Sequence, residues 1–204
     1  MRSVLRGTLA IVVLVCGGAV QPSAQITPAV PITDQTLTSM QDLVATQVFE
    51  TRVRQYVRLH RVLEGPLPPM RSTTEMDDIR ATMHALARRI QAARARENQG
   101  EIITPDVARM FRRRIATCLP PEEWAAVFAD IDVDEAGVSV APPALRVNME
   151  WPHEVPFNDV PSQLLLALPP LPSELQYRII GRSLVLWDHH ANLIVDFLPA
   201  AFMT

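Results

Sequence analysis

An Asp-His-His run near the end of the chain brings together residue types that could do chemistry. Asp188, His189 and His190 stand between two apolar stretches, Ser183–Trp187 and Leu193–Phe197. Imidazoles and carboxylates are metal ligands, and the same groups occur in phosphoesterase sites. Neighbouring residues on a strand point to opposite faces, so two adjacent histidines rarely share one metal ion. An aspartate followed by short polar residues suits a tight turn equally well.

We therefore interpret the run as the turn of a β-hairpin and assign no metal ligand. Metal binding by Asp188, His189 and His190, with further ligands from elsewhere in the fold, is the alternative. The DHH phosphoesterases carry the same tripeptide, but with upstream aspartate motifs on an α/β fold, which this chain lacks.

A second acidic motif, DIDVDEAG, runs from Asp130 to Gly137. Its alternating aspartates are typical of the start of an EF-hand loop, where carboxylate oxygens bind Ca²⁺. The sixth position should be glycine and is Glu135, and the twelfth should be glutamate and is Ala141. We interpret the motif as the acidic exit of a helix.

Other candidate groups favour structural roles. His60 lies on an apolar helical stripe and is expected to be packed, and Trp151 and Trp187 are expected to cover the sheet or fill the core. The arginine clusters are expected on solvated helix faces, because no aromatic residues alternate with them as in single-strand nucleic-acid binders. These arginines are Arg54, Arg58, Arg61, Arg88, Arg89, Arg94, Arg96 and Arg112–Arg114.

The composition excludes several function classes. All 19 basic residues are arginine, which removes Schiff-base and P-loop lysines. The net charge of −3 argues against nucleic acid as the partner. No G-x-S-x-G, H-E-x-x-H or C-x-x-C motif is present. We predict no catalytic residues and no cofactor.

Residues 1–24 have the pattern of a secretory signal peptide: Arg2 and Arg6, an apolar run, then small residues. Cleavage after Ala19 or after Ala24 fits the pattern, and we leave both open. The run is too short for a transmembrane anchor. A lipoprotein cysteine at Cys16 is the less favoured alternative, because the preceding residue is not small. The prediction is export to the periplasm or beyond the cell.

One cysteine remains after removal of the signal peptide. Cys118 cannot pair within the chain, so packing alone must hold the fold. It continues an apolar helical stripe, and we predict a buried free thiol.

Periodicity divides the rest of the chain into a helical region, 34–131, and a β-rich region, 132–204, after an extended lead-in, 25–33. Helical spacing predicts helices over 34–63, 105–118 and 121–131, with a further short helix over 162–168. Between the first two of these, another helix is expected from the Ser72–Glu75 capping box to Asn98–Gly100, suited to antiparallel packing against the helix at 34–63. Alternation and turn residues predict a three-strand meander over 176–180, 183–187 and 193–197, with short strands at 138–140 and 145–149. The predicted class is α+β.

The C-terminal pattern resembles known sequences. Leu175, Tyr177, Arg178, Gly181 and the LVL, D and ANLIVD residues that follow look like the end of uncharacterised exported proteins from bacteria with GC-rich genomes. They are also loosely similar to the final hairpin of RcnB-like periplasmic proteins, which are linked with nickel and cobalt homeostasis. The resemblance implies export and a β-hairpin module, and we carry over no metal role from it.

These observations favour a non-enzymatic exported protein that acts by binding or assembly, through an unidentified protein partner or by self-association of the helical region. A periplasmic metal-binding or metal-responsive protein is the alternative, and a hydrolase comes third.

Overall fold

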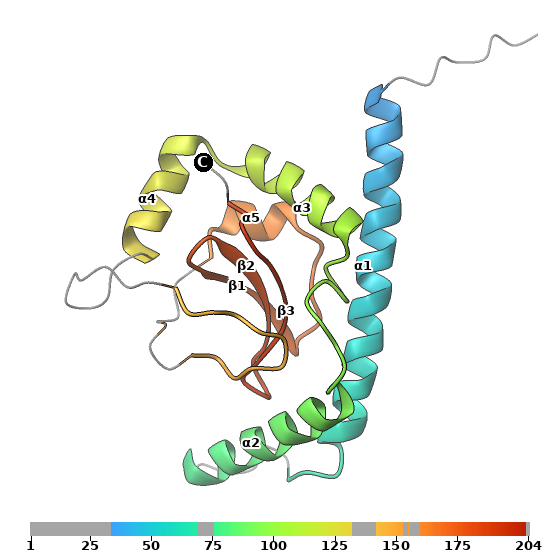
Figure 1. Ribbon diagram of the computed structural model, residues 1–204, viewed down its shortest axis with the longest axis vertical. Helices are drawn as coiled ribbons and strands as arrows, with labels where there is room; N and C mark the ends of the chain where they lie inside the picture. Colours follow the sequence, from blue (N-terminus) through green and yellow to red (C-terminus); the bar gives the residue numbers. More distant parts are fainter. Residues whose placement is uncertain (1–33, 69–75, 132–141, 153–154, 156–159, 203–204) are drawn as a thin grey trace, which may run out of the picture. The chain divides into compact units, whose positions relative to one another are not determined.

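A computed structural model of the chain describes residues 34–68, 76–131, 142–152, 155 and 160–202 (Figure 1). Over these residues helices come first and a three-stranded antiparallel sheet last, which confirms the predicted α+β class. The elements are α1 (Asp34–Glu64), α2 (Met76–Ala93), α3 (Pro105–Cys118), α4 (Pro121–Ile131), α5 (Ser162–Ala167), β1 (Leu175–Ile180), β2 (Ser183–Asp188) and β3 (Leu193–Leu198).

Helix α1 contributes to the core only from Ala45 onward. Its buried residues recur three or four apart, as a helix with one apolar face requires; they are Ala45, Phe49, Val53, Tyr56, Val57 and His60. No residue of 34–44 is buried. The apolar spacing of the sequence continues through that stretch, so the two parts of α1 present different apolar surfaces.

The sheet is a meander in the order β1-β2-β3. Strand β1 pairs with β2 from Leu175 opposite Asp188 to Ile180 opposite Ser183, across the turn at Gly181, where φ is +53°. Strand β2 pairs with β3 through Asp188 opposite Leu193, with a β-bulge after Leu186. Because side chains alternate along a strand, this register turns Trp187 and Asp188 to opposite faces of the sheet.

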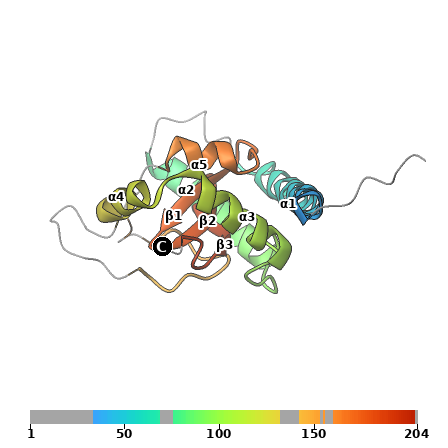
Figure 2. The same ribbon diagram turned by 90° about the horizontal axis from the view of Figure 1, so that it is seen from above.

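The two faces of the sheet are covered differently. Helices α1, α3 and α5 share one core with β-strand residues such as Leu186 and Val195, and α3 contacts both α1 and α5 (Figure 2). On the other face Val185 and Trp187 pack with Trp151, which belongs to the irregular segment 142–152. Helical and β residues therefore share a continuous core.

The predicted strand at Leu145–Met149 is wrong. Residues 142–146 have no regular structure, and a turn follows in which Asn148 has φ of +63°. Asn148 exchanges hydrogen bonds with Arg94, whose guanidinium donates to its Oδ1 (3.0 Å) and whose carbonyl accepts from its Nδ2 (2.8 Å). These bonds hold the segment as an irregular cover, which is linked to β3 by an isolated bridge between Glu150 and Leu193 and by backbone hydrogen bonds. The strand predicted at 138–140 lies outside the described residues.

Helix α2 buries Leu86 and Ile90, which lie four residues apart on one face of the helix. It crosses α1 near the end of α1, where Arg89 donates a hydrogen bond to the carbonyl of Leu63, and does not lie along its length (Figure 1). The region predicted as signal peptide and lead-in, 1–33, is outside the described residues. None of the helices that the structure describes is both long and apolar enough to cross a bilayer.

Candidate functional site

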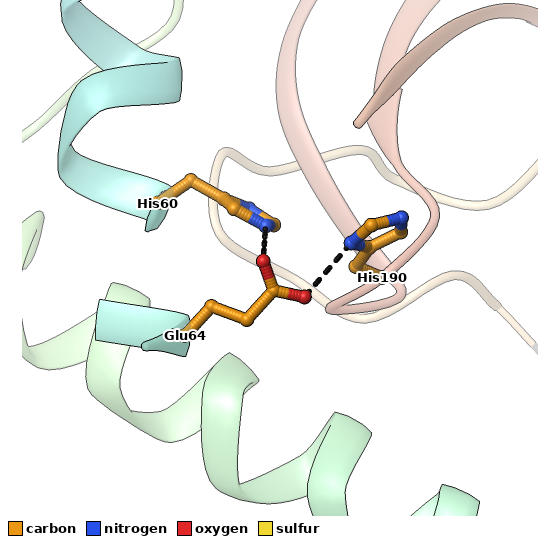
Figure 3. A group of neighbouring side chains, drawn as sticks. All are labelled: His60, Glu64 and His190. Atoms are coloured by element: carbon orange, nitrogen blue, oxygen red, sulfur yellow. Dashed lines mark hydrogen bonds and ion pairs between the residues drawn. The ribbon is translucent and has the colours of Figure 1, made fainter. Parts of the chain in front are cut away.

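The last two turns of α1 meet the turn between β2 and β3, and three ionisable side chains converge there (Figure 3). His60 and Glu64 are four residues apart on α1, which places them on one face of the helix. Nε2 of His60 lies 3.2 Å from Oε2 of Glu64, and Nδ1 of His190 lies 3.0 Å from Oε1. The Glu64 carboxylate thus lies between two imidazoles that come from distant parts of the chain.

Asp188, at the end of β2, connects the two sides of this cluster. Its Oδ2 accepts a hydrogen bond from the Tyr56 hydroxyl at 2.6 Å and another from Nδ1 of His60 at 2.6 Å. Its Oδ1 accepts the backbone N–H groups of His190 at 3.0 Å and Ala191 at 2.9 Å. The same carboxylate therefore shapes the turn that carries His190 and orients the ring of His60.

Burial and neighbouring charge act on His60 in opposite directions. Its desolvation lowers the pKa, but the hydrogen bond and charge of Asp188, followed by those of Glu64, outweigh it and raise the pKa above the ordinary value. Tyr56, packed under the guanidinium of Arg94, has its pKa raised by burial and by the charge of Asp188. The two carboxylates therefore favour the protonated form of His60.

The arrangement fits a metal ion. His60, Glu64 and His190 each offer one ligand atom, and these atoms all lie within 4.8 Å of one another. His60 is fully buried, whereas the Glu64 and His190 side chains are 31% and 25% exposed. Two imidazoles and one carboxylate form a three-ligand set that leaves a further coordination position open. The carboxylate of Asp188 on the far nitrogen of His60 matches the outer partner that metal-bound histidines commonly have.

His189 lies beside the cluster and is not part of it. Its Nε2 donates to the carbonyl of Ser173 (2.6 Å) and its backbone N–H to the carbonyl of Glu174 (3.3 Å). Glu174 in turn accepts a hydrogen bond from Nε of Arg61, one residue after His60. Burial raises the pKa of Glu174, but the Arg61 hydrogen bond outweighs it and the net pKa is lowered. This bridge ties α1 to the segment before β1.

The sequence predictions for this region hold in part. The turn at His189–Asn192 is confirmed, and so is the burial of His60. Of the three residues kept as alternative metal candidates, His190 joins the cluster, Asp188 lies behind His60, and His189 faces away. Glu64 was missed. Its spacing from His60 was visible in the sequence, but nothing there linked either residue to His190.

The acidic DIDVDEAG motif and Cys118 provide less evidence about function than the cluster does. Asp130 and Ile131 end α4, and the remainder of the DIDVDEAG motif, from 132, lies outside the described residues. Cys118 is a free thiol, as predicted, but it is only half-buried. Its Sγ donates to the carbonyl of Ile115 at 3.3 Å, and burial raises its pKa, which disfavours the reactive thiolate.

Arg94 differs from the predicted solvated faces, and Arg113, although exposed, pairs within the fold. Arg94 is buried and donates to the carbonyl of Val195 as well as to Asn148. Arg113 pairs with Asp42 across the contact of α3 with α1. These arginines connect elements of the fold.

The two tryptophans pack in the core, as predicted. Trp151 and Trp187 lie with ring centroids 5.6 Å apart. His84 lies 3.6 Å from Glu150 on the surface, and His153 is outside the described residues.

Comparison with protein-family models, with curated proteins and with solved structures finds no match for this chain.

Proposed function

We propose that the protein is an exported metal-binding protein that holds a divalent transition-metal ion through Nε2 of His60, the carboxylate of Glu64 and Nδ1 of His190. The observation that carries the proposal is the convergence of these three ligand atoms within 4.8 Å at the junction of α1 and the β2–β3 turn.

Two features favour a metal site over a network of ion pairs. First, Asp188 occupies Nδ1 of His60, so the remaining nitrogen, Nε2, faces Glu64 and becomes a ligand once its proton is displaced. Second, the cluster is open to solvent on the side of Glu64 and His190, so an ion can enter without unfolding of the core. A purely structural ion pair needs neither feature.

The types of ligand atom restrict which metal ions the site can bind. Imidazole nitrogen suits Zn²⁺, Ni²⁺ and Cu²⁺, whereas Ca²⁺ and Mg²⁺ prefer oxygen alone. A pair of histidines with one glutamate is an established zinc ligand set with a vacant fourth position. We therefore expect Zn²⁺ to bind, with Ni²⁺ and Co²⁺ as competitors of similar coordination chemistry.

Export rests on the sequence pattern of residues 1–24, two arginines followed by an apolar run and small residues. Outside the cytoplasm, a partly exposed His-Glu-His site meets metal ions directly. Binding of such ions is the role that we assign to the mature protein.

The test is titration of the untagged, processed protein with Zn²⁺ in competition with a chromophoric chelator. We expect one ion per chain with a Kd of about 1 μM or tighter, which corresponds to about 8 kcal/mol. Co²⁺ replaces Zn²⁺ as a spectroscopic probe, because its visible absorption reports imidazole ligands and coordination number.

The variants Glu64→Gln and His190→Ala are expected to weaken binding by at least about tenfold. His189→Ala is the matched control, because it removes the neighbouring imidazole, which faces Ser173, and is expected to leave affinity unchanged. Absence of stoichiometric binding, or an equal loss in the control, contradicts the proposal.

A further inference from the structure

The exposed half of α1 carries an apolar stripe that the rest of the described chain leaves uncovered. Its residues are Leu37, Met40, Val44 and Val48, which are 46%, 58%, 60% and 37% exposed. They line a groove between α1 and α3, whose floor is Ala45 and whose rim carries Asp106, Arg109 and Arg113. At 3.6 residues per turn the stripe falls on a side of α1 away from the buried Phe49 and Val53.

A projecting helix of this kind needs a partner. The stretch 34–44 contains several Thr, Ser, Asp and Gln residues, and no residue in it is buried. A polar end of a helix gains little stability from its own residues when it lacks tertiary packing, even where it continues into a longer helix such as the 31-residue α1. A row of exposed apolar side chains at helical spacing marks an interaction surface.

From these observations we infer that the groove is filled by the same helix of a second copy, so that the protein forms an antiparallel homodimer through the N-terminal halves of two α1 helices. The apolar spacing is nearly the same in both directions along the helix. With a two-fold axis near Asp42, Leu37 of one copy lies opposite Val48 of the other, and Met40 lies opposite Val44. The surface is therefore complementary to itself, as an isologous interface requires.

The charges favour the same arrangement. Residues 34–51 contain acidic but no basic side chains, and Arg52 follows directly in the chain. The groove rim carries Arg109 and Arg113, which pair with Asp106 and Asp42 of the same chain. Antiparallel packing brings the first-turn Asp34 of one copy toward Arg52 and Arg109 of the other, and it opposes the two helix dipoles. A parallel pair would place Asp34 against Asp34.

The size of the apolar surface limits the affinity of the proposed dimer. The stripe from 37 to 48 spans about 17 Å at 1.5 Å per residue, and a helix is about 10 Å wide. Even with the α3 rim this is smaller than the roughly 800 Å² per partner of a standard stable interface. We therefore expect a weak dimer that dissociates on dilution.

The first test is sedimentation velocity of the full processed protein over a concentration series. We expect reversible dimerisation, weakened at least tenfold by Val44→Glu. Val62→Glu is the matched control, because Val62 is 70% exposed on the same helix and lies outside the groove. A monomer at every concentration, or an equal effect of both variants, overturns the proposal.

Cysteine cross-linking in a Cys118→Ser background tests the geometry. Met40 and Val44 lie opposite each other in this arrangement, so a mixture of Met40→Cys and Val44→Cys brings two cysteines within disulfide range and a covalent dimer is expected. Leu37→Cys alone is expected to remain monomeric, whereas a mixture of Leu37→Cys and Val48→Cys is expected to cross-link. Cross-linking of Leu37→Cys with itself refutes the antiparallel arrangement. A monomer in which Val44→Cys resists thiol labelling shows that the protein's own N-terminal segment covers the groove, and this also refutes the dimer.

Discussion

Replacement of Asp188 by asparagine tests whether the orientation of His60, and not merely its presence, makes the cluster a metal site. In the wild type, Oδ2 of Asp188 accepts hydrogen bonds from His60 Nδ1 and the Tyr56 hydroxyl, both at 2.6 Å. Asparagine can keep its oxygen on the backbone N–H groups of the turn, and its amide nitrogen then faces His60. An amide nitrogen only donates, so it favours the imidazole tautomer with the proton on Nε2.

That tautomer is wrong for a metal ion, because the proton occupies the nitrogen that faces Glu64. To bind a metal ion through Nε2, His60 must carry its proton on Nδ1. The Nδ1–H group and the N–H group of the introduced amide then point at each other, and the hydrogen bond between residues 60 and 188 is lost. The loss is one hydrogen bond to a charged group, about 1.5–3 kcal/mol. At 1.4 kcal/mol per factor of ten, this corresponds to a loss of metal affinity of about 10- to 150-fold.

The assay compares Zn²⁺ affinity by chelator competition with the free energy of unfolding in urea, for the wild type and Asp188→Asn. We expect the variant to fold and to lose affinity in the stated range. Tyr56→Phe is the control: it removes another hydrogen bond to Asp188 but leaves the tautomer of His60 unchanged, so affinity should remain within about threefold. A folded Asp188→Asn protein that binds Zn²⁺ as tightly as the wild type refutes this account of the site.

Three further predictions concern the fold that supports the site. Gly181→Ala should lower the free energy of unfolding by about 1–3 kcal/mol in urea titrations, because its φ is +53° and an added Cβ would lie 2.8 Å from Cβ of Pro142. Asp196→Asn should cost about 2–4 kcal/mol in the same assay, because the buried carboxylate accepts three backbone N–H groups from the loop before α3. Glu174→Gln should destabilise the protein at neutral pH but progressively less below about pH 4.3. The reason is that Arg61 helps to lower the folded pKa of Glu174, so its stabilising effect is present above the unfolded pKa and disappears as the pH falls through the folded value; an unfolding difference independent of pH would contradict this.

Local patterns in the sequence were sufficient for most of the elements. The helical spacing in 34–63 and the alternation in 183–187 and 193–197 gave element boundaries that the structure moves by only one residue. Helical periodicity, strand alternation and turn formation depend on residues that are close in the sequence, so they can be recognised from the sequence alone. The segment 145–149 has the alternation of a strand, but Arg94, which follows a distant helix, holds Asn148 in a turn. That tertiary contact cannot be seen in local sequence.

The same limit explains why the site was predicted only in part. His60 and Glu64 face the same way because they are four residues apart, and the Asp-His-His turn could be recognised between its strands. The step that unites them is the contact of Glu64 with His190, which are 126 residues apart. It depends on how the sheet packs against α1, and no local rule fixes that packing.

Asp188 shows how one side chain can serve the turn and the site together. A turn-forming aspartate needs only the acceptor that receives the N–H groups of His190 and Ala191, and asparagine or serine would serve there. Its second oxygen lies in the core between Tyr56 and His60, where a charge is costly unless it is satisfied. The strand end could therefore be held at lower electrostatic cost by a neutral residue. The carboxylate is needed if His60 must keep its proton on Nδ1 and present Nε2 to Glu64, which is the requirement that the proposed metal binding sets.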